Sequence, residues 1–486
     1  MDSDFIWIGI LLLVVALQTG YIHPDEFFQN PEVVAADIFN ISHFRAWEFN
    51  PHFALRSVSI PYLISGIPFT ILRILENGLH FRVSPQLMLI IPRMSMFFLI
   101  PILEWLLLML TKSWNISTSS VKMVFRTSYL TFVFLPRTFS NSVEVVLFAG
   151  LMLAVFYPDK NHKSGNVTTV AVGVISALGI FNRPTFLAFG CVPWMYFLYV
   201  SKMRSVINTA FFGALTMCVL VAVDSWYYGQ FVITPLRFIV YNIDAKNNEL
   251  HGLHPRWFHL IVSLPQLFGT LLWCFFQLGI VRFIMQRKLL FLSFLVPVCL
   301  ISIIPHQEPR FLLAVLVPLF LLAAEFTWKS RIRRTVWIVF NLLLGIFFGF
   351  IHQGGLTQSL PFVRTLLDED PSARVFYYKT YIPPFYTLRL PLDQSHRVLD
   401  LGLERLTLED VGQTIHHHPR TKNFLILPGT IDLNYAPLGS VTATLVQQFC
   451  PHWSFEAQVA YDQIFRKLPE LCLNVWNIAL KKSAPK

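Results

Sequence analysis

Charged residues are scarce in this chain of 486 residues. They make up 14% of it, against roughly 25% in soluble domains. Hydrophobic residues reach 54%, and the mean hydropathy is +0.54. This composition excludes an ordinary soluble protein. The net charge of +10 does not indicate a nucleic-acid-binding protein either, because Lys and Arg fall in short clusters between apolar runs rather than along one face.

Paired cysteine motifs and processing signals are also lacking. The six cysteines show no CxxC spacing, which leaves a zinc or redox site without support. Cys450 and Cys472 lie in a polar tail and can form a disulfide if that tail is in an oxidising lumen. The first apolar run, Phe5–Gln18, has no basic segment before it and no cleavage site after it, so we expect it to be retained as an anchor.

Apolar runs recur from Phe5 to Ile351, and each is near the length of about 20 residues that a helix needs to cross a bilayer. We predict an all-α polytopic membrane protein of the multi-span kind, with about 11 to 13 transmembrane or re-entrant helices. The candidate spans are residues 5–21, 57–75, 88–110, 121–136, 140–157, 167–182, 184–200, 206–224, 257–281, 289–305, 310–327 and 335–351.

Three basic clusters between spans indicate the topology: Lys202–Arg204, Arg282–Lys288 and Lys329–Arg334. The positive-inside rule places them in the cytosol. Counting back from them puts residues 225–256, 306–309 and the tail outside, and counting forward from a cytosolic N-terminus puts the loop 22–56 outside too. The two counts disagree by one span between residues 57 and 200, so one element there is predicted not to cross. Helix-breaking residues at Pro136-Arg137 and Arg183-Pro184 favour a re-entrant piece near them.

The composition turns polar at His352. Short strand-like runs, Arg374–Tyr381, Asn423–Leu427 and Val475–Leu480, are separated by turn residues. We therefore predict a membrane domain over residues 1–351 and a small mixed α/β luminal domain over residues 352–486. The run His416-His417-His418 is interpreted as a solvated turn, because adjacent imidazoles have poor geometry for a metal ion.

The loop after the first span carries two adjacent carboxylates, Asp25 and Glu26, just outside the membrane. A general base can act there. Pro24 disfavours helix at His23, so the two acidic residues begin a new element. The alternative for Asp25 is that it caps this helix.

A second polar cluster, His306–Phe311, lies between two strongly apolar spans. Ionisable residues at the membrane edge are costly and commonly mark substrate paths. Arg310 with His306 would suit a phosphate through charge-assisted hydrogen bonds. The alternative is a pair between Glu308 and Arg310 that only pins the helix ends.

Further polar residues stand near predicted span ends: Arg137, Asn141, Arg183, Asp224, Tyr228, Asn242 and His254. Taken singly, such residues are usually structural, with Arg183 as an interfacial snorkel and Asp224 as a helix cap. Taken together, they indicate an anionic, lipid-borne substrate.

At these residues the chain resembles the family-22 glycosyltransferases of the GT-C type, which take mannose from dolichyl-phosphate-mannose in the endoplasmic reticulum lumen. The segment His306–Phe311 is similar to that family's His-Lys-Glu-x-Arg-Phe motif, with Gln307 in place of the Lys. The subgroup that adds the fourth mannose of glycosylphosphatidylinositol (GPI) precursors resembles the chain most, and glutamine fits it. The segments that carry this likeness are Gly20–Val33, Arg45–Phe49, Arg56–Val58, Leu63–Gly66, Pro136–Asn141 and Asp224–Gly229.

The resemblance implies an inverting α-1,2-mannosyl transfer to the third mannose of a GPI precursor, on the luminal side of the endoplasmic reticulum membrane. An inverting transfer needs a carboxylate that takes the proton of the acceptor hydroxyl. Asp25 is the first candidate and Glu26 the second. Arg310 and His306, aided by Arg137 or Arg183, can stabilise the leaving phosphate without a metal ion. We expect no cofactor and no obligate protein partner beyond the donor lipid, the GPI precursor and membrane lipid.

Other functions stay open at this point. A related family-22 enzyme would act on the third GPI mannose or on the lipid-linked N-glycan precursor. A transporter would line a path through the membrane with charges and broken helices, but here the polar clusters gather at one face. A non-catalytic subunit that binds lipid would keep the fold and make the carboxylates dispensable.

Overall fold

The computed structural model describes residues 3–157, 166–244, 246–247, 252–277, 279–417, 421–431, 433, 441–457 and 470–480. The chain divides into two compact units that alternate along the sequence. The first unit comprises Met1–Ile8, Ala46–Ile64 and Met94–Leu343, and the second comprises Gly9–Arg45, Ser65–Arg93 and Leu344–Lys486. The side chains of the predicted solvated turn at His416–His418 lie outside the described residues.

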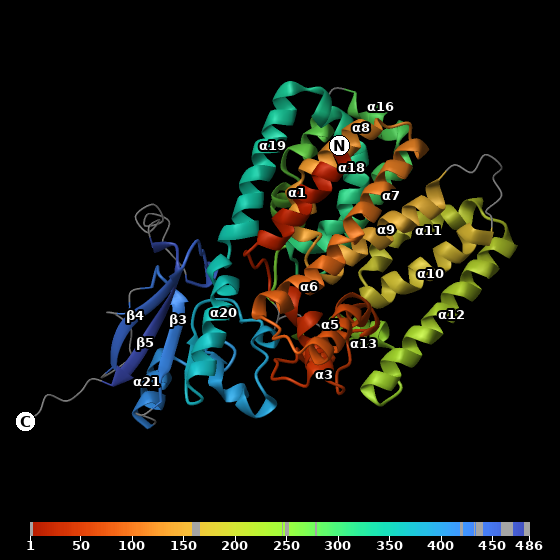
Figure 1. Ribbon diagram of the computed structural model, residues 1–486. Coiled ribbons are helices and arrows are strands. Elements are labelled where there is room, and N and C mark those ends of the chain that lie inside the picture. The colour runs from red at the N-terminus through yellow and green to blue at the C-terminus, as the bar shows by residue number, and fades with distance from the viewer. Residues whose placement is uncertain are drawn as a thin grey trace, which may run out of the picture. The chain divides into compact units, whose positions relative to one another are not determined.

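The first unit is a bundle of apolar helices, and in Figure 1 its helices α9 to α12 lie side by side. A Cβ at Gly173 of α10 would lie 2.8 Å from the backbone nitrogen of Gly213 of α12, so these two helices pack through small residues, as membrane helices often do. The elements are η1 (Trp47–Phe49), α4 (Ser59–Pro61), η2 (Tyr62–Gly66), α7 (Leu99–Ser113), α8 (Thr118–Thr127), η3 (Leu130–Phe134), α9 (Ser140–Phe156), α10 (Asn166–Asn182), α11 (Phe186–Val200), α12 (Met203–Tyr228), α13 (Thr234–Ile243), η4 (His259–Ser263), α15 (Leu264–Phe268), η5 (Gly269–Phe276), α16 (Ile280–Gln286), α17 (Lys288–Ser302), η6 (Pro309–Val315), α18 (Leu316–Lys329) and α19 (Arg331–Ile346).

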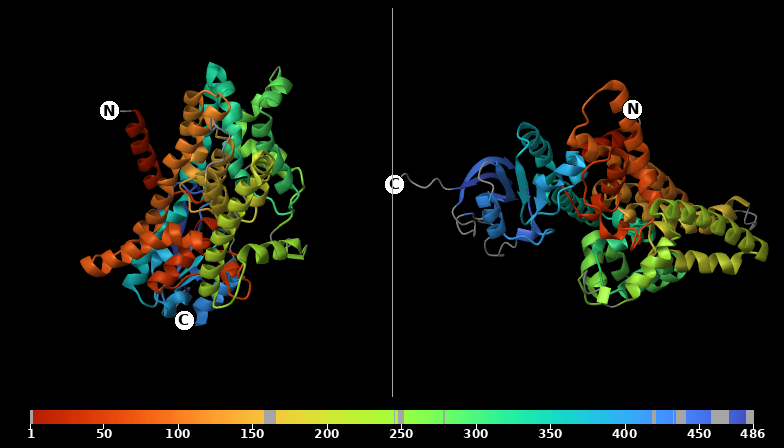
Figure 2. Two further views of the ribbon diagram at one scale, coloured as in Figure 1. Left: turned by 90° about the vertical axis from the view of Figure 1, so that its right-hand side faces the viewer. Right: turned by 90° about the horizontal axis from the view of Figure 1, so that it is seen from below.

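The second unit combines helices with a five-stranded sheet, visible in Figures 1 and 2. Its sheet has the order β2-β1-β3-β5-β4, with β1 parallel to β2 and β3, and β5 antiparallel to β3 and β4. The elements are α1 (Ser3–Leu17, which begins in the first unit), α2 (Asp25–Phe28), α3 (Pro31–Phe39), α5 (Ile67–Leu79), α6 (Pro85–Phe97), η7 (Phe347–Ile351), α20 (Gly354–Glu369), β1 (Arg374–Tyr377), η8 (Phe385–Leu388), η9 (Leu392–Arg397), β2 (Val398–Asp400), α21 (Leu408–His417), β3 (Asn423–Pro428), β4 (Val441–Phe449), η11 (Phe455–Ala457) and β5 (Leu473–Leu480).

The polar tail confirms the predicted strands. The runs expected to form strands become β1, β3 and β5, whereas β2 is too short and β4 too exposed for the sequence pattern to reveal them. Between strands, α21 packs its apolar face on the sheet through Val411 and Ile415. The disulfide between Cys450 and Cys472 is present, as expected for a tail in an oxidising compartment.

The prediction of a polytopic membrane protein is confirmed. Within the described ranges, five helices are long and apolar enough to cross a membrane, and one bent pair, Ile280–Gln286 with Lys288–Ser302, qualifies as a sixth. Four shorter apolar helices, Asp4–Leu17, Ser140–Phe156, Val167–Asn182 and Phe186–Val200, accompany them. The span Pro309–Lys329 is 78% buried, whereas Met203–Tyr228 is 11% buried. The former therefore lies in the protein core, and the latter presents its apolar side chains to lipid.

Residues 57–75, predicted to form a span, are not among the described helices that are long and apolar enough to cross a membrane, and α5 lies beside the first loop. On α5, the ring of Phe69 meets that of Phe39 at 5.8 Å. Arg73 donates a hydrogen bond to the carbonyl of Ile38 in α3, and Glu76 pairs with Arg389 of the tail. These contacts hold α5 against α3 and the tail. The residues at Pro136 and Arg183 mark breaks between consecutive helices instead.

Candidate functional site

The acidic pair of the first loop opens α2, a single helical turn. Pro24 occupies the capping position before it, so the interpretation of Asp25 as the helix cap is wrong. The Asp25 side chain is 25% exposed, and its Oδ1 lies 3.7 Å from Nδ1 of His23. Its Oδ2 accepts a hydrogen bond from Nε2 of Gln29 at 2.7 Å. These contacts orient a partly exposed carboxylate, as a candidate general base requires.

Glu26, the second candidate base, has a different environment. Its side chain is fully buried, and its Oε1 lies 2.9 Å from Nε and 2.8 Å from Nη2 of Arg93. Arg93 also donates to the carbonyl of Gln18 at 3.0 Å, and its guanidinium faces the ring of Phe27. A carboxylate enclosed with a guanidinium cannot approach an acceptor hydroxyl. The geometry therefore favours Asp25 as the base and makes Glu26 part of the support of the loop.

Backbone contacts with the C-terminal part of the chain fix this loop. The N–H of Gly20 donates to the carbonyl of Gly349 at 2.7 Å, and a Cβ on Gly20 would overlap the carbonyl oxygen of Phe348, so only glycine fits. Tyr21 donates its N–H to the carbonyl of His352 at 2.9 Å, and its own carbonyl accepts from Nδ1 of that ring at 2.8 Å. Burial lowers the pKa of His352 to about 4, so the ring is neutral.

Glu32 ties α3 to the tail of the chain. Its side chain is fully buried, and its Oε1 accepts the backbone N–H groups of Phe44 at 3.1 Å and Tyr386 at 3.2 Å. Burial raises the pKa of Glu32 well above its ordinary value, which favours the protonated form. Glu32 therefore joins the two segments by hydrogen bonds.

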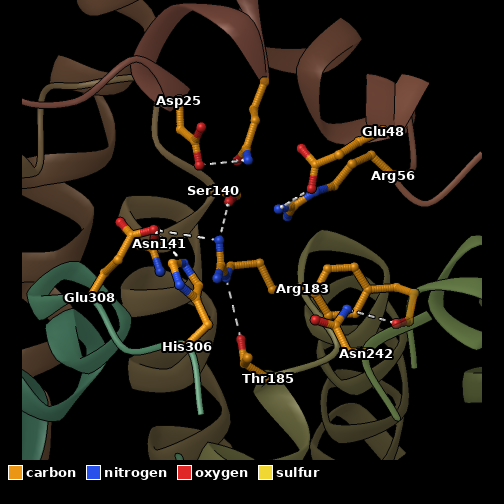
Figure 3. A network of polar contacts seen from close by, with 12 residues as sticks. Asp25, Glu48, Arg56, Ser140, Asn141, Arg183, Thr185, Asn242, His306 and Glu308 are labelled. Carbon is orange, nitrogen blue, oxygen red and sulfur yellow. Dashed lines mark hydrogen bonds and ion pairs between the residues drawn. The ribbon is translucent and has the colours of Figure 1, made fainter. Parts of the chain in front are cut away.

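A second group of polar side chains is buried among α9, α10 and α11 of the first unit (Figure 3). Arg183 is 3% exposed, and its Nη1 donates to Oγ of Ser140 at 3.0 Å and to Oδ1 of Asn141 at 3.4 Å. Its Nε lies 3.9 Å from Oε2 of Glu144, whose Oε1 accepts the hydroxyl of Thr185 at 2.9 Å. The interpretation of Arg183 as an interfacial snorkel is wrong, because its guanidinium is enclosed by protein.

The His306–Phe311 segment lies against this group. Glu308 bonds both of its neighbours: Oε1 is 2.9 Å from Nε2 of His306, and Oε2 accepts Nε of Arg310 at 2.5 Å. The alternative expectation of a Glu308–Arg310 pair is thus confirmed, and Glu308 raises the pKa of His306. The guanidinium of Arg183 faces the ring of Phe311 at 5.1 Å. Two guanidinium groups and the His306 ring therefore lie among two carboxylates, and groups of this kind can bind a phosphate.

Gln307 does not belong to the charged face of this motif. Its side chain is 1% exposed, and its Oε1 accepts the backbone N–H of His259 at 3.1 Å. Its Nε2 donates to the carbonyls of Ser302 at 3.0 Å and Ile304 at 3.1 Å. Gln307 therefore joins the end of α17 to the first turn of η4.

Substitution of Gln307 tests this structural role. Gln307→Leu leaves a buried N–H and two carbonyls without a partner, and we expect it to lower the free energy of unfolding by about 1–3 kcal/mol. Gln307→Lys keeps a donor for both carbonyls and should lower the free energy of unfolding by a smaller amount. Thermal unfolding of the two variants in one detergent measures the difference, and equal losses would contradict the hydrogen-bonding role.

Asp224 and Tyr228 position the segment that carries Arg56. Asp224 is fully buried; its Oδ1 accepts the hydroxyl of Ser57 at 2.9 Å and its Oδ2 that of Thr234 at 2.7 Å. The hydroxyl of Tyr228 donates to the carbonyl of Arg56 at 2.7 Å. Both oxygens of Asp224 thus bind protein groups, so these residues act through the backbone they hold.

The remaining predicted site residues are His254, Asn242 and Arg137. His254 is brought to the motif, with its ring 6.4 Å from that of His306. Asn242 donates from Nδ2 to a carbonyl one turn earlier in α13, at 2.8 Å. Arg137 is fully buried and donates from Nε at 3.2 Å to a carbonyl one turn earlier. His254 is therefore adjacent to the candidate phosphate site, while Asn242 and Arg137 each bond their own backbone.

Sequence reasoning missed Arg93, Glu144 and Glu32. Arg93 and Glu144 lie inside predicted apolar spans, where an ionisable residue is costly and indicates a partner or a function; that signal could have found both. Glu32 gave no such signal, because its partner Tyr386 lies 354 residues further along the chain.

Comparisons with known proteins agree with this architecture. The human protein named GPI alpha-1,2-mannosyltransferase 4 is 34% identical over 88% of this chain and 86% of its own length. The Saccharomyces cerevisiae protein named GPI mannosyltransferase 4 is 31% identical over 76% of this chain and 74% of its own length. The crystal structure of ArnT from Cupriavidus metallidurans bound to undecaprenyl phosphate superposes with a TM-score of 0.50 at 10% identity, covering 99% of both chains. This likeness shows the fold, which is the GT-C membrane glycosyltransferase fold. A sequence profile of the Alg9-like mannosyltransferase family matches residues 4–420, and the chain belongs to that family.

Proposed function

We propose that this chain transfers a mannosyl group from dolichyl-phosphate-mannose to the third mannose of a GPI precursor, forming an α-1,2 linkage with inversion. The observation that carries the proposal is an oriented, accessible carboxylate, Asp25, and a buried cationic cluster around Arg183 in a chain of the Alg9-like mannosyltransferase family. Relatives named GPI mannosyltransferase 4 that are up to 34% identical support the choice of acceptor.

On the acceptor side, Asp25 takes the proton of the attacking hydroxyl. The hydroxyl oxygen forms a bond to the anomeric carbon of the donor mannose, and the bond from that carbon to the phosphate oxygen breaks. The hydrogen bond from Gln29 keeps the carboxylate in one orientation. A positioned base of this kind typically contributes about 10²- to 10⁴-fold to the rate.

On the donor side, the departing dolichyl phosphate gains negative charge. Arg183, Arg310 and His306 supply positive charge for it, and Glu144 and Glu308 hold these cationic groups in place. Because the groups are fixed before substrate arrives, little reorganisation is needed as charge develops.

We further propose that the reaction needs no metal ion or cofactor, since the cationic side chains supply the charge compensation. Activity of the purified protein should therefore survive treatment with excess EDTA. The assay is transfer of radiolabelled mannose before and after chelation, with add-back of magnesium and manganese. Loss of activity that either ion restores would contradict this proposal.

The proposed location is the endoplasmic reticulum membrane, with Asp25 on the luminal side. The basic clusters support it, because the positive-inside rule places them in the cytosol and the first loop and tail fall on the other side by count. The Cys450–Cys472 disulfide supports an oxidising environment for the tail.

Mass spectrometry of GPI precursors tests the acceptor. Cells that lack their own fourth-mannose activity are made to express this chain, and we expect a four-mannose GPI lipid to appear. The lipid-linked N-glycan precursor is measured in the same cells as a control. If well-expressed protein yields no four-mannose lipid, the acceptor is wrong, and an altered N-glycan precursor would favour the related activity instead.

A further inference from the structure

The segment Trp47–Arg56 and Tyr241 of α13 form a cluster that the reaction described above does not use. We propose that this cluster is a subsite for a mannose of the acceptor glycan. The inference rests on the proposed function and assigns residues that bind acceptor sugar rather than donor phosphate.

The first component is an aromatic platform. The Trp47 ring is 5.0 Å from that of Tyr241, and Phe53 packs edge-on against Trp47 at 5.4 Å. Although it is held between these rings, Trp47 stays 36% exposed. An indole fixed in this way offers an apolar surface to the C–H face of a pyranose at low conformational cost.

The second component is the ion pair of Glu48 and Arg56. Both the Nε and the Nη2 of Arg56 bond one oxygen, Oε1 of Glu48, at 3.0 and 2.9 Å. The two side chains are 11% and 13% exposed. Their guanidinium and carboxylate stand side by side, and together they offer a donor and an acceptor of the kind that neighbouring sugar hydroxyls bind.

The segment that carries these groups is fixed by several contacts. The N–H of Leu55 donates to the carbonyl of Glu48 at 2.9 Å, which closes the loop. Gln230 donates to the carbonyl of Pro51, and Arg237 donates to that of Phe53 at 3.4 Å. The subsite is therefore formed before the sugar binds, which lowers the entropic cost of binding.

The subsite adjoins the candidate phosphate site of the same unit. Figure 3 shows the guanidinium of Arg56 directed toward the same space as that of Arg183. A mannose held by Trp47 and Glu48 would thus lie next to the group that binds the donor phosphate, as a transfer between two lipid-linked substrates requires.

Steady-state kinetics test the subsite, with dolichyl-phosphate-mannose and a synthetic three-mannose GPI lipid as substrates. We expect Trp47→Ala to raise the KM for the acceptor at least about tenfold and to leave the KM for the donor unchanged. Trp47→Phe should keep most of the affinity, and Glu48→Gln should raise the acceptor KM while leaving the ring in place. Trp226 is 85% exposed, and Trp226→Ala is the matched control for an aromatic residue of the membrane interface.

Saturation-transfer NMR with a soluble trimannoside separates this inference from the proposed function. Wild type and Trp226→Ala should show binding, and folded Trp47→Ala should not, whichever lipid the enzyme finally modifies. Equal signals from Trp47→Ala and Trp226→Ala would overturn the subsite. A rise in the donor KM alone would overturn it as well, because the platform would then bind the donor. Absence of four-mannose lipid with an intact NMR difference would instead count against the proposed acceptor.

Discussion

Asp25→Asn should slow mannosyl transfer strongly and leave the protein folded. The substitution keeps the shape of the side chain and an oxygen for Gln29, but it removes the group that accepts the hydroxyl proton. We expect kcat to fall by about 10²- to 10⁴-fold, with the KM values for both substrates within about threefold of the wild type. Initial rates with purified protein, together with thermal unfolding, measure the effect.

Asp37 provides a matched control in the same loop. It accepts a hydrogen bond from Arg45 at 2.5 Å and is 24% exposed, close to the exposure of Asp25. Asp37→Asn should leave kcat nearly unchanged because this carboxylate has no role in the proposed reaction. It should also leave the protein folded, because an exposed ion pair contributes little to stability. If Asp25→Asn keeps activity within a few fold of Asp37→Asn, the base is another residue.

Glu26→Gln and Glu32→Gln should have opposite effects on stability, although both remove a buried carboxylate. Glu26→Gln leaves the guanidinium of Arg93 buried without its counter-charge, and removing one partner of a buried ion pair costs about 3–5 kcal/mol. Glu32→Gln keeps the oxygen that accepts the N–H groups of Phe44 and Tyr386 and carries no charge that burial can penalise.

The sign of the pH dependence separates the two cases further. Because the pKa of Glu32 is raised in the folded protein, the wild type loses stability as the pH rises from the unfolded-state value toward the folded-state value. Glu32→Gln should match the wild type at acidic pH and exceed it as the pH increases. Thermal unfolding between about pH 5 and about pH 8 measures both variants. A Glu26→Gln protein as stable as Glu32→Gln would show that the pair with Arg93 does not support the loop.

The lengths of the apolar runs and the placement of charged residues were enough to predict the polytopic helical fold. Short strand-like runs separated by turn residues were enough to predict three strands of the tail. The lengths of the apolar runs did not distinguish α5, whose apolar run is as long as a span. What distinguishes α5 is Glu76, whose partner Arg389 is 313 residues away. No local pattern contains that contact, so the count of spans could not place α5 beside the first loop.

The candidate site shows the same limit. Adjacent carboxylates at Asp25 and Glu26 are equivalent by sequence, and only the burial of Glu26 against Arg93 separates them. The residue types of the His306–Phe311 motif predicted a phosphate site, which stays a prediction, and the alternative pair of Glu308 and Arg310, which is present. That Gln307 points into the protein could not be predicted, because its partners are backbone groups, which any residue type supplies.

The bonds that hold the first loop also determine when it can form during synthesis. The ribosome completes Tyr21 and Glu32 early, but their partners follow 331 and 354 residues later, at His352 and Tyr386. Until then the nascent loop lacks these two contacts, although the pair of Glu26 with Arg93 can form earlier. A premature stop codon shortly after Ile351 would therefore spare both polar clusters in the gene and still remove the bonds to Tyr386 that hold the loop carrying Asp25.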